Sequence, residues 1–459
     1  MSSVLSPGVP ALKAAPGPRG FPLLGVLPQA WKNPLEFFLG AARQYGDVVS
    51  LRLGFHRVYL LNHPDHVKYV LQDHYRNYRK PTRVEKVKVL FGEGVTVSEG
   101  DLWRRQRHLM EPAFSPQRIA ALARVMTDAT ATMLERWRAV AARGEALDIA
   151  AEMMRLTQGI AVKTLFSTDV EGEVDAVRRA LTIALEYVND RAWAFCDLGE
   201  HMPTPRNRQF RHALRTLDRI AYRMIAARRK SAHETGDLLS MLLSARDAET
   251  GEGLSDAEVR DQVMTLFIAG HEPTANALAW TWHLLTMYPH MQRRLHGKLA
   301  AVLGGGAPAF HDLAHLPYVR MVIEEAMRLY PPTWLTARSP IEDDEIGGYH
   351  IPADSVVLLS PYVMHRHPAF WEDPEAFDPE RFTPERVASR PRYAYFPFGG
   401  GPRMCMGMHF ALMEAQLIVA MVAQIYRLAP VPGHPVEPHP MIALRPRHGV
   451  LVTLDPRSA

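Results

Sequence analysis

A cysteine inside a glycine-rich stretch is the residue best suited to chemistry. Residues 396–407 read Phe-Pro-Phe-Gly-Gly-Gly-Pro-Arg-Met-Cys-Met-Gly, and a strongly apolar helical run follows at once. Glycines allow tight turns and close approach to a flat partner, and they leave backbone N–H groups free to point at a sulfur atom. A helix N-terminus beside Cys405 favours its thiolate. These features indicate a metal ligand or a nucleophile, whereas many lone cysteines are inert and buried.

Composition limits the kind of protein that could position this cysteine. The chain has 459 residues, of which 47% are hydrophobic and 22% charged, a balance typical of globular proteins. Its net charge of +4 is too small to indicate nucleic acid as a main partner. Two cysteines, Cys196 and Cys405, are too few for a disulfide framework and fit a reducing compartment. We therefore expect a cytoplasmic protein.

Neither the N-terminus nor the apolar stretches indicate a membrane anchor. The first 34 residues are rich in Pro, Gly and Ala and lack the pattern of a signal peptide. Residues 263–285 and 410–425 are strongly apolar, but polar side chains such as Glu272 and Glu414 interrupt them. They are expected to form buried helices.

The remaining pattern predicts mainly helix in one domain. Helical spacing covers 35–46, strand-like runs at 48–53 and 57–61 flank Gly54 as a hairpin, and amphipathic patterns dominate from 100 to 332. Residues 366–402 are too rich in Pro and aromatics for regular helix, and 440–454 alternates like a strand. Without a repeat or an interior linker, we expect a Pro/Gly-rich segment 1–33 followed by one domain over 34–459.

The pattern Phe398-x-x-Gly401-x-Arg403-x-Cys405-x-Gly407 resembles the haem-binding signature of the cytochrome P450 family. The resemblance implies haem b as cofactor, with Cys405 as the axial thiolate that favours O–O cleavage. It implies that Arg403 binds a haem propionate and that Phe398 and Gly407 belong to the haem-binding loop. Core packing is an equally simple role for Phe398.

A second landmark is an acid and two arginines. Glu325 and Arg328 are one helical turn apart and resemble the family's Glu-x-x-Arg motif, while Arg381 falls in Pro-Glu-Arg-Phe, like the later family motif. The resemblance implies a buried structural lock that holds the haem loop. Taken alone, such a pair is usually a solvated surface ion pair.

Further basic residues resemble the family's propionate ligands. Trp103-x-x-x-Arg107 resembles the segment along the haem edge, and Arg338 lies ten residues after Arg328, where many members carry another such arginine. Each could also be ordinary surface charge. With Arg107, a cluster of Arg104, Arg105 and His108 predicts a basic face that would suit an acidic electron donor.

Residues 269–274, Ala-Gly-His-Glu-Pro-Thr, resemble the family's oxygen-binding groove inside a helical pattern from 255 to 286. Ala269 and Gly270 would permit close approach to haem, and Glu272 with an alcohol would relay protons. The sequence departs from the family here, because Pro273 stands where a threonine is usual. Thr274 follows about 100° further around the helix.

The resemblance implies a single, mainly α, triangular domain with small β-sheets and haem between two long helices. It implies a monooxygenase that inserts one oxygen atom from O₂ into an apolar substrate. Because only about fifty residues follow Cys405, electrons are expected from a separate ferredoxin or flavodoxin with its reductase, and the protein is expected to be a monomer. Alternatives are a peroxide-using or isomerising enzyme on the same fold, a non-catalytic haem or ligand-binding protein, and a helical protein with a structural Cys405.

The substrate is not set by the sequence. The resemblance places it on a face lined by 80–99, 174–210, 268–274 and 333–337. Apolar residues that could line such a pocket are Val87, Leu90, Phe91, Val95, Ile268 and Leu335. At helical spacing such residues are more often plain core. Fatty acids, terpenoids, steroids and polyketides all remain open.

Overall fold

The computed structural model describes residues 13–166, 174–193, 202–230, 237–247 and 250–457. They form two compact units made of separate stretches of chain, so that no single cut divides them. Unit 1 comprises residues 1–81, 335–374 and 390–404, and unit 2 comprises 82–334, 375–389 and 405–459. The boundary expected at residue 34 stays a prediction. Cys196 and part of the expected substrate face, 194–201, lie outside the described residues.

Unit 1 is built around a five-stranded sheet in the order β1-β2-β8-β5-β3. Its strands are β1 (Val48–Leu53), β2 (His56–Leu61), β8 (Val356–Leu359), β5 (Thr336–Pro340) and β3 (Tyr78–Arg79). β1 and β2 pair antiparallel from Val48↔Leu61 to Leu53↔His56, which confirms the predicted hairpin. Gly54 has φ +62, a left-handed conformation that glycine adopts without strain.

Short helices and a two-stranded ribbon complete unit 1. They are α1 (Leu27–Lys32), α2 (Pro34–Tyr45), α3 (Pro64–Lys68), a π-helix (Tyr69–Asp73), β6 (Asp344–Ile346), β7 (Tyr349–Ile351), α15 (Pro361–Met364) and 3-10 turns at Tyr75–Asn77, Arg392–Ala394 and Gly401–Arg403. Helix α2 confirms the helix predicted at 35–46. Its buried residues Leu35, Phe38, Ala41 and Ala42 lie on one face, and the Asn33 side chain caps its N-terminus.

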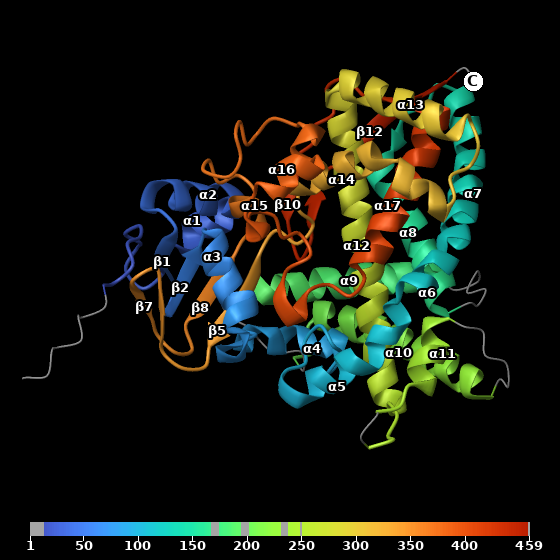
Figure 1. Cartoon of the computed structure of the whole chain (residues 1–459). Coiled ribbons are helices and arrows are strands. Elements are labelled where there is room, and N and C mark those ends of the chain that lie inside the picture. The colour runs from blue at the N-terminus through green and yellow to red at the C-terminus, as the bar shows by residue number, and fades with distance from the viewer. Residues whose placement is uncertain (1–12, 167–173, 194–201, 231–236, 248–249, 458–459) are drawn as a thin grey trace, which may run out of the picture. The chain divides into compact units, whose positions relative to one another are not determined.

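Unit 2 holds most of the helices, as the sequence predicted for residues 100–332 (Figure 1). The described helices are α4 (Glu85–Phe91), α5 (Gly100–Met110), α6 (Pro116–Ala121), α7 (Ala123–Ala142), α8 (Ile149–Phe166), α9 (Val174–Trp193), α10 (Pro205–Lys230), α11 (Leu238–Ser244), α12 (Asp256–Met287), α13 (Pro289–Leu303), α14 (Pro317–Leu329), α16 (Pro384–Ala388) and α17 (Met408–Ile425), with 3-10 turns at Thr82–Val84, Glu111–Phe114, Phe310–His315 and Pro379–Phe382. Small sheets come from β4 (Leu147–Asp148), β12 (Leu451–Pro456) and β9 (Tyr426–Pro430), and from β10 (Pro438–Pro440) with β11 (Leu444–Pro446).

Helix α12 is the central element of unit 2 and confirms the helix predicted at 255–286 (Figure 1, yellow). Ser255 and Glu258 form a capping box at its N-terminus, which satisfies two backbone donors reciprocally. It packs against α8, α10, α14 and α17. Most of its side chains are buried, so it positions residues on every side of the unit's core.

The apolar stretch 410–425 lies in α17, which is buried from Leu412 to Ala423 as predicted. Among the described residues, α17 is the one helix long and apolar enough to cross a membrane, and 67% of it is buried inside the protein. One expectation was wrong: residues 366–402 contain a short α-helix, α16. Pro384 at its first position has the φ that a helix start requires, and its missing N–H is no loss there.

Candidate active site

The Cys405 thiol lies just before α17, whose N-cap is Gly407. Burial raises the pKa of this thiol, whereas a hydrogen bond from the Gly407 N–H and the charge of Arg107 lower it. The side chain is nevertheless exposed and is not in a disulfide. A metal cation bound there would strongly favour the thiolate.

The glycines before Cys405 are required by turns within unit 1. Gly399 and Gly401 have φ of +72 and +63, which other residues rarely adopt. A Cβ on Gly401 would lie 1.8 Å from the Leu71 carbonyl oxygen, and one on Gly400 would lie 2.3 Å from the Tyr393 ring. The Tyr393 hydroxyl accepts the Gly401 N–H at 3.1 Å. These contacts explain why three glycines precede the cysteine.

Helix α5 carries the residues expected at the haem edge. Trp103 is buried, and Arg107 lies close enough to Cys405 to affect the thiol electrostatically. Arg107 Nε lies 3.4 Å from Glu111 Oε1, an ion pair one turn away. The structure therefore brings Arg107 and Cys405 together, as the family pattern implied.

The predicted basic face on α5 is largely neutralised by local acids. Arg104 pairs with Asp101 at 2.5 Å, and Arg105 Nη1 lies 2.7 Å from Glu258 Oε1. Arg105 also donates to the Gly253 carbonyl at 2.9 Å, so it ties the start of α12 to α5. Its role is structural, and the sequence could not show this because Glu258 lies 153 residues away.

An exposed position interrupts the buried middle of α12. Ala269 is exposed and Gly270 half-buried, while Ile268 and His271 on either side are buried. The accessible residues at this position are the small Ala269 and Gly270, and no atom of a neighbouring element lies within 4 Å of a Cβ placed on Gly270. Helix α12 therefore borders open space at the predicted groove. The helix continues through Pro273, which has no N–H to donate to the Ala269 carbonyl.

Glu272 is a buried acid next to this position. Burial raises its pKa, and the positive charge of Arg445 on β11 acts in the opposite direction. Thr274 is also buried. Arg445 was not identified from the sequence, because it follows Glu272 by 173 positions in a segment without a motif.

His271, between Gly270 and Glu272, is buried and hydrogen-bonded within the protein, so it is not a candidate for proton transfer. The His271 Nδ1 lies 2.5 Å from the Phe267 carbonyl oxygen. The Thr157 hydroxyl on α8 donates to the His271 carbonyl at 3.2 Å. Burial lowers the pKa of His271 to about 4. The ring is therefore neutral at pH 7, and the His271 backbone carbonyl joins α12 to α8 through Thr157.

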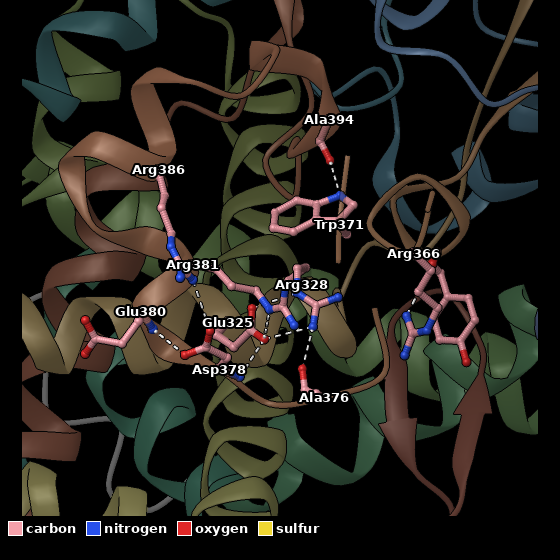
Figure 2. A network of polar contacts seen from close by, with 11 residues as sticks. Glu325, Arg328, Arg366, Trp371, Ala376, Asp378, Glu380, Arg381, Arg386 and Ala394 are labelled. Carbon is pink, nitrogen blue, oxygen red and sulfur yellow. Dashed lines mark hydrogen bonds and ion pairs between the residues drawn. The ribbon is translucent and has the colours of Figure 1, made fainter. Parts of the chain in front are cut away.

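Glu325, Arg328 and Arg381 form the predicted buried lock (Figure 2). Arg328 donates to both carboxylate oxygens of Glu325, at 2.7 and 2.8 Å, and neither side chain has exposed surface. Arg381 Nε lies 3.4 Å from Glu325 Oε1. The surface-pair alternative is excluded by this burial.

The lock also binds backbone that the sequence did not indicate. Arg328 Nη2 donates to the Ala376 carbonyl at 2.9 Å, and the Asp378 N–H donates to Glu325 Oε1 at 2.9 Å (Figure 2). The segment 375–389 is thus held against α14 by three charged side chains. That this lock holds the haem loop stays a proposal.

The loop between α4 and α5 is pinned to α12 by polar side chains. Asp261 accepts the Glu93 N–H at 2.8 Å, and Gln262 accepts the Val95 N–H at 3.0 Å. Leu90, Phe91, Val95 and Ile268, four of the predicted pocket residues, belong to one buried apolar cluster that Val87 borders. This part of the expected substrate face is therefore apolar, with a fixed backbone.

Three predicted cofactor residues, Arg338, Phe398 and Arg403, lie in unit 1. Arg338 on β5 donates to the Ala337 carbonyl at 2.8 Å, and Phe398 is half-buried rather than core. Arg403 ends the 3-10 turn Gly401–Arg403. Leu335, the remaining predicted pocket residue, also belongs to unit 1 and is half-buried. Their roles toward a cofactor or substrate rest on the sequence motif.

Comparison with known proteins decides the family. The cytochrome P450 family model matches residues 15–453, nearly the whole chain. The chain belongs to the cytochrome P450 family. It is similar to a crystal structure of the cytochrome P450DA haem domain, with a TM-score of 0.89 and 27% identity, covering 97% of this chain and 98% of that one. The predicted P450 fold and haem cofactor are thus confirmed.

Similar curated proteins are bacterial monooxygenases. Cyclooctat-9-en-7-ol 5-monooxygenase and cyclooctatin synthase of Streptomyces melanosporofaciens are both 40% identical, over 93% of this chain and 94% and 92% of their own lengths. Pentalenene oxygenase of Streptomyces avermitilis is 32% identical, over 93% of both chains. The protein is a P450 monooxygenase that inserts oxygen into apolar small molecules with electrons from redox partners.

The residues present fit a haem iron at Cys405. The sulfur is accessible, accepts the Gly407 N–H and lies near the cationic Arg107, the donor set that a thiolate ligand needs. The exposed Ala269 and the half-buried Gly270, around whose Cβ position no atom of a neighbouring element lies within 4 Å, leave room beside α12 for a flat group. Haem at this place agrees with the chemistry of the side chains.

Proposed function

We propose that this monooxygenase acts on a cyclic terpenoid. Support comes from the names of three similar proteins, a monooxygenase of cyclooctat-9-en-7-ol, a cyclooctatin synthase and an oxygenase of pentalenene. It also comes from the buried apolar cluster that includes Leu90, Phe91, Val95 and Ile268, because apolar side chains form no ion pair with a carboxylated substrate. A rigid hydrocarbon binds such a surface by burial of apolar area alone.

In this proposal the Cys405 thiolate would hold the haem iron. Trp103, Arg107, Arg338 and Arg403 bind the haem propionates, because arginine and indole N–H groups donate to carboxylates. Phe398 and Gly407 shape the loop around the sulfur. When bound, haem supplies the iron at which O₂ is cleaved, and a thiolate ligand favours that cleavage.

Proton delivery is assigned to Glu272, the Ala269 carbonyl and Thr274. Because burial raises the pKa of Glu272, this carboxyl keeps its proton to a higher pH than an exposed glutamate does, which suits a proton donor. The Ala269 carbonyl receives no bond from Pro273 and so is available to hold a water molecule. Gly270 keeps side-chain bulk away from this path.

The electron donor is proposed to be a separate ferredoxin or flavodoxin with its reductase. Of the basic residues on α5, the exposed His108 supports such a partner most directly, because Arg104, Arg105 and Arg107 each pair with an acid. The protein is proposed to work as a cytoplasmic monomer. Neither point changes the assignment of the substrate.

A panel of apolar compounds tests the proposed substrate class. Cyclic terpenes, fatty acids, steroids and polyketides are titrated into the purified holoprotein, and the Soret band is followed. A shift with a cyclic terpene, followed by an oxygenated product in the presence of a ferredoxin system, is expected. Saturable shifts with a fatty acid and none with terpenes would overturn the assignment. Turnover with peroxide and no donor would instead favour a peroxygenase, a reading that Pro273 motivates.

A further inference from the structure

Two turns of unit 1 lie side by side and present apolar side chains to solvent. Phe21 and Gly25 exchange backbone hydrogen bonds of 2.8 and 2.9 Å, which closes a turn around Leu23 and Leu24. The Leu24 carbonyl accepts the Gly54 N–H at 2.9 Å, so this turn is bound to the β1–β2 turn. Phe55 follows Gly54 directly. We call Phe21, Leu23, Leu24 and Phe55 the apolar tip.

The apolar tip is strongly exposed. Phe21 is 53% exposed, Leu23 70%, Leu24 41% and Phe55 80%. Scattered single apolar residues on a surface are ordinary, whereas four exposed apolar side chains on two hydrogen-bonded turns point to an interaction site. Trp31 on α1, a few residues further along the chain, is 64% exposed as well.

Hydrogen bonds and close contacts fix the backbone of the two turns, so the exposed position of their apolar side chains is set by the fold. A Cβ on Gly25, which has φ +61, would lie 1.8 Å from the Arg52 carbonyl oxygen. The Val26 N–H donates to that same carbonyl at 2.8 Å, and Arg52 Nη2 donates to the Phe21 carbonyl at 2.7 Å. A rigid presentation lowers the conformational entropy lost on binding.

Positive charge surrounds the apolar tip. Arg19, Arg52, His56 and Arg57 are exposed and lie within two residues of its members or pair across the β1–β2 hairpin. From residue 13 to residue 61 the basic side chains are Lys13, Arg19, Lys32, Arg43, Arg52 and Arg57, against only Glu36 and Asp47. Asp47 lies at the opposite end of β1 and faces His367 at 3.1 Å.

We propose that the apolar tip and its cations dock the protein peripherally on an anionic phospholipid membrane. Aromatic and leucine side chains enter the boundary between headgroups and acyl chains, and arginines remain at the phosphates. A lipid surface accepts protruding side chains without a preformed groove, and it supplies the negative charge that the arginines require. This inference does not depend on the substrate, since docking involves no turnover.

Flotation of the intact holoprotein with vesicles tests the proposal. Vesicles of phosphatidylcholine with an equal part of phosphatidylglycerol are compared with vesicles of phosphatidylcholine alone. The protein should float with the anionic vesicles, and added salt should weaken this. A wild-type protein that stays in the aqueous fraction with anionic vesicles would overturn the proposal.

Variants separate the two kinds of contact. The double variant Leu23→Ser/Phe55→Ser should partition into anionic vesicles about tenfold less, because apolar area is lost. Arg19→Gln/Arg57→Gln should lose about fivefold per charge and respond less to salt. The matched control is Phe310→Ser/Val387→Ser, which removes apolar side chains that are 44% and 47% exposed on unit 2 and should float like wild type.

Two other results would contradict docking on lipid. Equal flotation of Leu23→Ser/Phe55→Ser and wild type would show that the apolar tip is not the contact. A wild-type dimer in size-exclusion chromatography that this variant converts to a monomer would assign the surface to a second copy of the chain. Haem content and circular dichroism of each variant confirm that the fold is retained.

Discussion

Arg328 binds the carboxylate of Glu325 from one turn away on α14, with hydrogen bonds of 2.7 and 2.8 Å and no exposed surface on either side chain. Removing one partner leaves the other charge buried and unpaired, at a cost of about 3–5 kcal/mol of unfolding free energy. A domain's total stability is about 5–15 kcal/mol. Glu325→Ala and Arg328→Ala are therefore expected to yield little haem-loaded protein.

The same helix offers the control. Arg320 and Glu324 form an ion pair of 3.1 Å in which the arginine is exposed, so Arg320→Ala should change stability by at most about 1 kcal/mol. Yield and haem content of the purified proteins are the measurements. Normal haem content in both lock variants would show that the segment 375–389 does not need the lock.

The sequence was sufficient where the signal is local. Periodicity predicted α2 and α12, the strand-like runs on either side of Gly54 predicted the β1–β2 hairpin, and the one-turn spacing predicted the Glu325–Arg328 pair. It failed where partners are far apart in the chain. The Glu258 carboxylate that neutralises Arg105, the pinning of residues 93–95 by Asp261 and Gln262, and Arg445 beside Glu272 depend on tertiary packing, which no short pattern encodes.

Glu414 in α17 is a buried acid without a hydrogen-bond partner for either carboxylate oxygen among the described residues. Burial raises its pKa well above the usual value. The folded pKa therefore exceeds the unfolded one, and the protein loses stability as pH rises through the unfolded value, by about 1.4 kcal/mol per unit up to the folded pKa.

Glu414→Gln stays neutral at every pH and should escape this loss. Its unfolding free energy relative to wild type, measured by chemical unfolding, should rise from pH 5 to pH 8. The amide can also change stability by an amount that does not depend on pH, and this leaves the trend unaltered. The exposed Glu385→Gln on α16 should show no such trend. A difference independent of pH for Glu414→Gln would mean that the carboxyl ionises as readily folded as unfolded.

A substitution at Gly92 tests whether the α4–α5 loop needs its close contact with α12. A Cβ there would lie 2.0 Å from Asp261 Oδ1, and its φ is +57. Gly144 has a similar φ of +62 with open space around it. Both alanine variants carry the left-handed strain of about 1–2 kcal/mol, but Gly92→Ala must also displace Asp261.

Gly92→Ala should therefore lose about 1–3 kcal/mol more than Gly144→Ala in unfolding free energy. Gly92→Ala should also weaken the Soret shift caused by an apolar ligand, because Phe91 and Val95 flank the changed position. Gly144→Ala should leave this shift unchanged. Equal stability and equal ligand affinity in the two variants would argue against a fixed loop.

Pro273→Thr tests the proton path proposed around Glu272. The variant regains an N–H for the Ala269 carbonyl and an alcohol at the position where the family usually has threonine. Haem content and ligand binding should be retained, while the fraction of electrons recovered in product rather than peroxide should change. Equal product per electron in the two proteins would indicate that Pro273 acts only in packing.

The carbonyl complex of the reduced protein tests the central assignment, that Cys405 is the axial ligand, most directly. Wild type and Cys196→Ala should show the Soret band of a thiolate-ligated carbonyl complex. Cys405→Ala should lose it, because the exposed Cys405 side chain lies beside the Gly407 N–H and Arg107. An unaltered thiolate band in Cys405→Ala would contradict the account.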